Sequence, residues 1–366
     1  MRTTAVDVVV IGAGQAGLSS GYHLRRYGFA PESGFVILDH ARSAGGAWQY
    51  RWPSLSLGAT HRVHDLPGMP MGEQDDSRPA AEVVPEYFAA YERAFALPVR
   101  RPVSVRGVRY GPDGRLLVDT TNGRWAARAV INATGTWERP FWPSYPGRRE
   151  FTGRQLHTAD YESADEFAGQ HVVVIGGGTS AVQLLAEISQ VATTTWVTRR
   201  PPEFFEGPFT EELGRSVVDR VTARVRAGRL PQSIVSETGL PISPLVREAM
   251  DRDVLRRLPM FDRIEPDSVA WDDDTLVRAD VLLWCTGFRP VLDHLAPLGL
   301  RTPDGGIAVD GTRAVAEPRL HLVGYGPSAS TIGANRAGRA AVRDIRRLLG
   351  RTTATGLSPA RTETAS

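Results

Sequence analysis

The chain of 366 residues contains a single cysteine, Cys285, and no lysine. One cysteine excludes an internal disulfide, a Cys-x-x-Cys redox pair and a thiolate zinc site, and we expect no metal centre. Without lysine, the chain can neither form a Schiff base nor supply the lysine of a P-loop. All 43 basic side chains are therefore arginine, for which genomic base composition is a sufficient reason.

The sequence also lacks long apolar runs and a charge imbalance. Apolar runs such as residues 8–11 and 281–284 are far shorter than the about 20 residues that cross a membrane. No signal peptide precedes the first expected strand, so we expect a cytoplasmic protein with no membrane partner. The net charge is only +2 and the arginines are scattered, which argues against a nucleic-acid partner.

Length and composition favour two domains, or one α/β domain with an insertion. The apolar fraction of 42% is ordinary for a soluble globular protein, and the chain is too long for one small domain. Two glycine-rich segments that each follow an apolar run make two nucleotide-binding domains the better interpretation.

The first glycine fingerprint lies between a strand and a helix. Residues 6–11 are typical of a buried parallel strand, and residues 16–27 have the spacing of an amphipathic helix. The next strand is expected at 35–38 and ends at Asp39. This order of elements, closed by an acidic residue, is the setting in which such a fingerprint binds a dinucleotide.

The residue types in Gly12-Ala-Gly14-Gln-Ala-Gly17 explain how it would bind. Gly12 permits a tight turn, Gly14 lets the backbone approach a pyrophosphate, and Gly17 lets the helix pack close to the strand. The helix N-terminus offers N–H groups and partial positive charge to the phosphates. Asp39 can accept hydrogen bonds from ribose hydroxyls.

The second fingerprint, Gly176-Gly-Gly178-Thr-Ser-Ala181, has the same setting. A strand is expected at 171–175, a helix at 180–189 and a strand at 194–198. Arg199 and Arg200 follow that last strand, where an NAD site would carry an acidic residue. Guanidinium groups there suit the 2′-phosphate of NADPH, although a solvated basic pair is the alternative and NADH remains a possible donor.

Further helices and strands are expected in the rest of the chain. We expect a helix at 84–95, short strands between 103 and 131, buried strands at 281–284 and 320–323, a helix at 331–349, a partly helical insertion at 201–268 and a disordered tail at 351–366.

A motif between the two fingerprints carries a family resemblance. The pattern Phe151-x-Gly153-x-x-x-His157-x-x-x-Tyr161 resembles the identifying motif of class B flavoprotein monooxygenases, which are the flavin-containing monooxygenases and their Baeyer–Villiger relatives. The turns Asn132-Ala-Thr-Gly135 and Trp284-Cys-Thr-Gly287 resemble the Ala-Thr-Gly turns of that family. The likeness covers roughly residues 5–349 and is strongest to the short bacterial type II flavin-containing monooxygenases.

The resemblance implies an α/β fold with two Rossmann-like dinucleotide-binding domains. The FAD-binding domain would be split into residues 1–158 and 287–350, and the NADPH-binding domain, residues 159–286, would be inserted into it. The helix at 331–349 would return to the flavin.

The resemblance also implies the reaction. An NADPH-dependent FAD monooxygenase would insert one oxygen atom from O2 into a small organic substrate through a C4a-(hydro)peroxyflavin. S- or N-oxygenation and Baeyer–Villiger oxidation of a ketone both remain open, and a homodimer is plausible in this family.

The site residues divide between the two cofactors. For FAD we expect Gly12, Gly14, Gln15, Ala16, Gly17, Asp39, Gly46, Ala47, Trp48, Val105, Ala133, Thr134, Gly135, Gly326, Thr331 and Ile332. For NADPH we expect Gly176, Gly178, Thr179, Ser180, Arg199, Arg200, Cys285, Thr286 and Gly287.

No residue is assigned to catalysis with certainty. His157 is interpreted as an organiser of the two domains rather than as a base, while His61, His64 and Arg139 are possible pocket residues. Many flavin-containing monooxygenases have an asparagine beside the flavin after Gly-Gly-x-Trp, but here no asparagine precedes Asn122. Without this asparagine, an oxygenated flavin would be short-lived unless another group stabilised it.

Three rival functions share features of this sequence. A disulfide reductase of the thioredoxin-reductase type shares the two fingerprints but requires two cysteines, so the single Cys285 excludes it. An NAD(P)H-dependent flavin reductase or oxidase that releases H2O2 stays open because of the missing asparagine. A non-catalytic redox sensor that binds both nucleotides is the third alternative.

Overall fold

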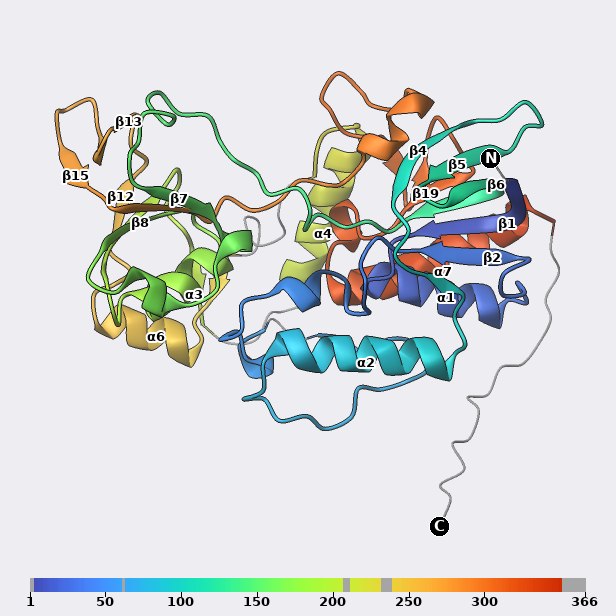
Figure 1. Ribbon diagram of the computed structural model, residues 1–366, viewed down its shortest axis with the longest axis horizontal. Helices are drawn as coiled ribbons and strands as arrows, with labels where there is room; N and C mark the ends of the chain where they lie inside the picture. The colour runs from blue at the N-terminus through green and yellow to red at the C-terminus, as the bar shows by residue number, and fades with distance from the viewer. Residues whose placement is uncertain (1–2, 61–62, 207–210, 232–238, 351–366) are drawn as a thin grey trace, which may run out of the picture. The chain divides into compact units, whose positions relative to one another are not determined.

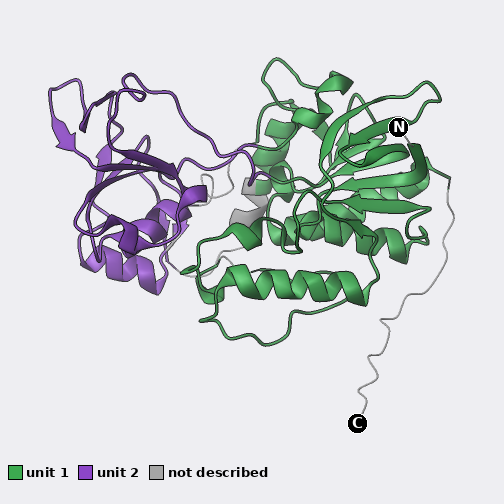
Figure 2. Ribbon diagram, viewed as in Figure 1, with its two compact units in different colours: residues 1–135, 218–232, 290–366 green, residues 136–217, 233–289 purple. Residues whose placement is uncertain are grey.

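The computed structural model describes residues 3–60, 63–206, 211–231 and 239–350. The chain forms two compact units (Figure 2). Unit 1 comprises residues 1–135, 218–232 and 290–366, and unit 2 comprises residues 136–217 and 233–289. Each unit therefore contains one of the two glycine fingerprints.

Unit 1 is built on a sheet whose main strand order is β17-β18-β19-β6-β1-β2-β3, with β4 and β5 extending it from β6. The strands β19, β6, β1, β2 and β3 run parallel. The bounds are β1 Thr3–Ile11, β2 Phe35–Leu38, β3 Val99–Arg100, β4 Val105–Tyr110, β5 Leu116–Thr120, β6 Gly123–Asn132, β17 Val309–Asp310, β18 Arg313–Ala314 and β19 Leu320–Leu322.

Successive side chains of β1 point to opposite faces of the sheet, so the core of unit 1 has two layers. Val8 and Val10 face the helices α1 (Gln15–Arg26), α7 (Thr331–Leu348) and α2 (Ala80–Ala94). Val9 and Ile11 face the opposite layer, which includes β4, β5 and the 3-10 turn η5 (Asp293–Leu298). Because both faces are covered, the second half of β1, residues 8–11, is entirely apolar and buried. Figure 1 shows α1 and α7 lying along one side of this sheet.

Unit 2 has a parallel sheet of order β12-β9-β8-β16-β7. A short antiparallel meander, β13-β14-β15, and the pair β10-β11 accompany it. The bounds are β7 Arg154–His157, β8 His171–Ile175, α3 Thr179–Ile188, β9 Thr193–Thr198, β10 Phe204–Phe205, β11 Leu240–Pro241, α6 Pro244–Asp251, β12 Arg257–Pro259, β13 Arg263–Glu265, β14 Ser268–Ala270, β15 Leu276–Arg278 and β16 Val281–Trp284. The helix α4, Glu211–Arg226, contains the point at which the chain passes from unit 2 to unit 1.

The predicted strands and helices around both fingerprints agree with the structure to within a few residues. The helix expected at 84–95 begins earlier, at Ala80, and includes Pro85 in its second turn. The turns at residues 111–114 and 121–123 join β4 to β5 and β5 to β6.

The compact units divide the chain at different residues from those predicted. Residues 136–158 belong to unit 2, because β7 forms parallel pairs with β16 of that unit. The segment 201–268 is not one insertion, since β12 adds an edge strand beside β9 and residues 218–232 belong to unit 1. The tail at 351–366 lies outside the described residues.

Among the described helices, none combines the length and apolar character needed to cross a bilayer.

A buried ion-pair triad ties the end of β2 to α2. Arg101 donates through Nε to Asp39 Oδ2 at 2.6 Å and through both terminal nitrogens to the carboxylate of Glu92 at 2.7 Å. These side chains are only 12%, 4% and 14% exposed, respectively. Removing one partner from such a group leaves uncompensated buried charge, which makes the triad a sensitive point for stability.

Replacing Arg101 with Met should therefore lower the free energy of unfolding by about 3–5 kcal/mol, as measured by denaturant titration. The matched control is Arg100→Met, because Arg100 pairs with Glu32 at 2.7 Å but both side chains are about half exposed. The control should cost less than about 1 kcal/mol. Equal losses in the two variants would contradict this account.

Candidate functional site

The first glycine loop is held by contact between backbones. Gly12 has a φ of 98°, and a Cβ placed there would lie 2.5 Å from the carbonyl oxygen of Ala133. A Cβ on Gly17 would lie 1.9 Å from the carbonyl oxygen of Gly12. A larger residue at Gly12 would push the turn at Ala133 away from β1, and a larger residue at Gly17 would push the helix α1 away from it. The protein's own packing therefore requires these two glycines.

Gly14 is different, because nothing inside unit 1 requires it. Its φ is −80°, which any residue adopts, and a Cβ would meet only Gly46 Cα at 3.9 Å. Gly14 caps α1, and no side chain caps this helix end. The free N–H groups and the open backbone beside them fit a diphosphate, as in the FAD site predicted for Gly12, Gly14, Gln15, Ala16 and Gly17.

The loop that follows β2 packs onto this helix end. Gly46 has a φ of 53°, and a Cβ there would lie 2.8 Å from Gly14 Cα. Gly46 begins the 3-10 turn η1, Gly46–Tyr50, which contains the predicted residues Ala47 and Trp48. Trp48 is partly buried against the helix-side core, and the guanidinium of Arg51 lies 5.6 Å from its ring centroid. Trp48 therefore has a packing role, and the turn that contains it lies against Gly14 of the glycine loop.

The N-terminus of α7 meets the same helix end. Gln15 Nε2 donates to the carbonyl oxygen of His64 at 3.0 Å and to Asn335 Oδ1 at 3.1 Å. The backbone N–H of His64 donates to Thr331 Oγ1 at 3.2 Å. The structure therefore brings together Gln15, His64 and Thr331, while Ile332 beside them is 36% exposed. His61 lies outside the described residues.

Other predicted FAD residues have varied surroundings. Asp39 lies at the end of β2, and its Oδ2 is already bonded to Arg101. Val105 packs against the core layer on the opposite side of the sheet from α1. Gly326 has a φ of 59°, and a Cβ there would meet Val225 at 2.7 Å, so packing within unit 1 explains this glycine.

The second glycine loop repeats the geometry of the first. Gly176 has a φ of 139°, and a Cβ there would lie 2.2 Å from the carbonyl oxygen of Cys285. Gly178 has a φ of −101° and nothing within 4 Å of a Cβ, so unit 2 itself does not require it. Gly178 is the N-cap of α3, and no side chain caps this helix end. A second dinucleotide fits this end in the same way.

The arginine pair lies where the sequence predicts it. Arg199 and Arg200 follow β9 and are exposed, and the Thr198 hydroxyl donates to the Arg200 carbonyl oxygen at 2.8 Å. That carbonyl oxygen is 4.0 Å from a Cβ position on Gly177, so the pair borders the glycine loop. Across the described part of the chain, no carboxylate forms an ion pair with either guanidinium.

Sequence reasoning missed Arg289. Burial lowers the pKa of Arg289, and the charges of Arg199 and Arg139 lower it further, so three cations lie near one another in unit 2. The Arg289 guanidinium also lies 4.0 Å from the ring centroid of Phe141. The signal available in the sequence is a cationic residue two positions after Gly287.

His157 has both ring nitrogens engaged by the backbone. Its Nδ1 accepts from the N–H of Ala159 at 3.1 Å, which leaves Nε2 to donate to the carbonyl oxygen of Gly287 at 3.0 Å. The ring is fully buried, and burial lowers its pKa. A neutral, fully bonded imidazole of this kind positions the Gly287 turn and has no nitrogen free to act as a base.

The single cysteine is unreactive in its surroundings. Cys285 is buried, and burial raises its thiol pKa to about 12. Thr286 follows it and donates through Oγ1 to the Phe141 carbonyl oxygen. The turn thus contributes backbone to the glycine loop rather than a nucleophile.

Comparison with known proteins gives a consistent family. The family model for pyridine nucleotide-disulphide oxidoreductases matches residues 9–229. A flavin-containing monooxygenase from Stenotrophomonas maltophilia has a similar structure, with 42% sequence identity, a TM-score of 0.81 and coverage of 94% of this chain and 99% of its own.

Two relatives are more distant. The uncharacterized oxidoreductase CzcO of Bacillus subtilis is 30% identical over 304 residues, covering 82% of this chain and 86% of its own. A Baeyer-Villiger monooxygenase from Streptomyces coelicolor is 29% identical over 201 residues, covering 54% of this chain and 38% of its own.

The turn that closes the first glycine loop is braced by buried His294. Asn132 Nδ2 donates to Thr134 Oγ1 at 3.0 Å, so Asn132 Oδ1 accepts from His294 Nε2 at 2.6 Å. Burial lowers the pKa of His294 from 6.5 to about 4. A histidine that stays neutral when folded stabilises the fold above pH 6.5, and this contribution is lost as the pH falls toward 4.

Each such histidine contributes up to about 1.4 kcal/mol per pH unit to that loss. In the His294→Gln variant the free energy of unfolding should therefore fall less steeply below pH 6.5, by up to about 1.4 kcal/mol per pH unit. Denaturant titration at constant ionic strength measures this slope. His321→Gln should act similarly, because burial lowers the pKa of His321 to about 4 as well. Slopes identical to that of the unsubstituted protein would refute this assignment.

Proposed function

The chain belongs to the pyridine nucleotide-disulphide oxidoreductase family, among its FAD-dependent monooxygenases, and from this premise we propose that NADPH is its electron donor and a small organic molecule its substrate. The observation that carries the proposal is the likeness to the Stenotrophomonas enzyme along almost the whole chain. The family name does not imply disulfide chemistry here, because Cys285 is the only cysteine and is buried.

We assign FAD to unit 1. Its diphosphate would bind the uncapped N-terminus of α1 beside Gly14, and the N-terminus of α7 would approach the ring system through Thr331 and Ile332. Asp39 would hold the ribose while Arg101 keeps its carboxylate oriented. Bound FAD supplies the electron transfer and the activation of O2, so the chain needs no dense group of acids and bases.

We assign NADPH to unit 2. Its diphosphate would bind the N-terminus of α3 beside Gly178, and Arg199 and Arg200 would bind the 2′-phosphate. Arg289 and Arg139 extend the positive charge around the Gly287 turn, which His157 holds in place. The role of His157 in organising the two units remains part of this proposal.

A competing function is an oxidase that releases H2O2. It is favoured by the lack of any asparagine before Asn122, because a group that would stabilise an oxygenated cofactor is missing from the loop after Trp48. Sulfide, amine and ketone substrates are all compatible with the proposal, so a test has to include each class.

Reaction stoichiometry separates the two functions. With FAD-loaded protein, NADPH and a panel of sulfides, amines and ketones, at least one substrate should yield an oxygenated product in an amount matching NADPH consumption beyond the H2O2 formed. Mass spectrometry with 18O2 would show that the inserted atom comes from O2. If H2O2 accounted for all NADPH with every substrate, the protein would be an oxidase.

The arginine pair makes a separate prediction about the donor. Arg199→Gln and Arg200→Gln should each raise the KM for NADPH about tenfold or more, since a charge-assisted hydrogen bond contributes roughly 1.5–3 kcal/mol. NADH lacks the 2′-phosphate and serves as the internal control, so its KM should change less than about twofold. Parallel increases for both donors would place the 2′-phosphate elsewhere.

A further inference from the structure

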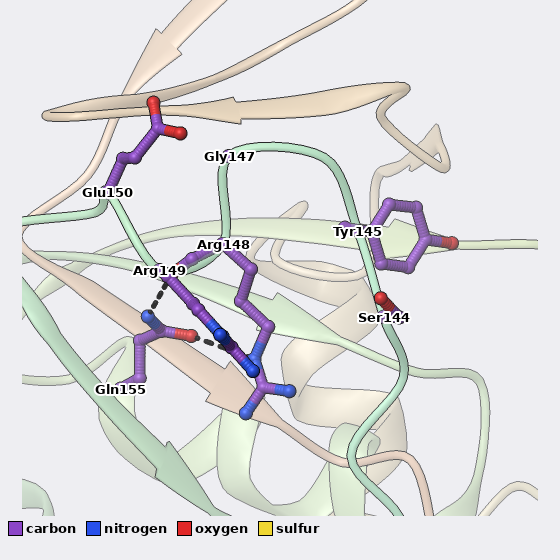
Figure 3. Close-up of a pocket in the computed structure, with 7 residues that line it drawn as sticks. All are labelled: Ser144, Tyr145, Gly147, Arg148, Arg149, Glu150 and Gln155. Atoms are coloured by element: carbon purple, nitrogen blue, oxygen red, sulfur yellow. Dashed lines mark hydrogen bonds between the residues drawn. The ribbon is translucent and has the colours of Figure 1, made fainter.

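A hollow of about 610 Å³ lies in unit 2 beside the N-terminal end of β7. It is lined by the segment 144–150, apart from Pro146, and by Gln155. In the view of Figure 3 the guanidinium groups of Arg148 and Arg149 overlap, and the carboxylate of Glu150 is directed away from them. The predicted NADPH residues at 176–180, 199–200 and 285–287 are not among the residues of this wall.

Arg148 is held in a fixed orientation. Its Nε donates to Gln155 Oε1 at 3.3 Å, and Gln155 Nε2 donates back to the Arg148 carbonyl oxygen at 2.8 Å. Its guanidinium also lies 4.7 Å from the ring centroid of Trp142 and 5.4 Å from that of Trp284. A guanidinium fixed in this way loses little conformational entropy when it binds a ligand.

The two cations are poorly compensated within the protein. Burial lowers the pKa of Arg148, and the neighbouring charge of Arg149 lowers it further. Within the described residues, no carboxylate forms an ion pair with either arginine, although Arg154 at the start of β7 pairs with Glu166 at 2.8 Å. Two adjacent guanidinium groups without a carboxylate repel each other, and an anion in the hollow would remove that repulsion.

We propose that this hollow, formed by Arg148, Arg149, Ser144 and Gln155, binds a phosphate group, either as free phosphate or as the phosphate ester of a small molecule. Two guanidinium groups match the charge and the several acceptor oxygens of a phosphate dianion, and Ser144 adds a neutral donor. None of the residues assigned to NADPH lines this hollow, and a phosphate site here goes beyond the oxygenation reaction.

Calorimetric titration of the full-length, FAD-loaded protein tests the proposal. Inorganic phosphate and adenosine 5′-monophosphate are the two probes, used at low ionic strength because screening weakens such contacts. Arg149→Gln should weaken binding of the preferred probe about tenfold, and Arg148→Gln at least as much. Equal affinity for both probes would indicate free phosphate, and tighter binding of the nucleotide would indicate an ester.

Two matched variants separate this site from others. Arg256→Gln removes the same charge from an exposed position of unit 2, where Arg256 is 82% exposed, and should leave the affinity unchanged. Arg200→Gln should weaken NADPH but not phosphate in this hollow, whereas Arg149→Gln should leave the KM for NADPH unchanged. Failure of the NADPH assignment and failure of this site would therefore give different results.

Arg149→Gln is the more informative variant, because Arg149 is exposed and makes none of the ring contacts that hold Arg148, so its loss should not disturb the fold. Near-ultraviolet circular dichroism would show whether Arg148→Gln disturbs the packing of Trp142 and Trp284. The proposal is wrong if neither probe binds saturably below about 10 mM, or if Arg149→Gln binds as tightly as Arg256→Gln.

Discussion

Contact of one backbone directly against another is the constraint on which both units depend. In unit 1 the carbonyl of Ala133 occupies the space where Gly12 would carry a Cβ, and in unit 2 the carbonyl of Cys285 does the same at Gly176. Matching hydrogen bonds hold these turns, from Ala133 N–H to Ile11 and from Cys285 N–H to Ile175, each at 2.8 Å. The glycine loop, the start of the next helix and the closing turn are therefore positioned as one piece, twice in the chain.

That arrangement also separates two kinds of glycine. Gly12 and Gly176 are required by neighbouring backbone atoms, so their presence says nothing about a ligand. Gly14 and Gly178 have ordinary φ angles and room for a Cβ, so protein packing gives no reason for them. In the proposed cofactor sites, a phosphate that approaches the backbone closely would supply the reason, and both glycines cap helices that lack a side-chain cap.

The sequence predicted those parts of the fold that a local pattern of residues determines. Apolar runs, helical spacing and glycine positions located both βαβ units, because a buried parallel strand and the turn after it leave a local signature. The bounds of the compact units differ from the predicted domain bounds, since the pairing of β7 with β16 joins residues far apart in the chain. The same reason hid the bond of Arg101 to Asp39 and the place of β12 beside β9. Arg289 was missed because its meaning comes from the nearby charges of Arg199 and Arg139.

Three side chains of the kinds that often perform acid–base or nucleophilic chemistry have structural roles in the described part of the chain. The Cys285 thiol is buried with its pKa raised, His157 bonds backbone through both nitrogens, and His294 braces a turn. Arginine is the abundant charged residue near the proposed NADPH site, and it binds anions without exchanging protons near neutral pH. This arrangement suits a protein that holds the proposed anionic cofactors in a fixed geometry, and their chemistry would then supply the reactivity.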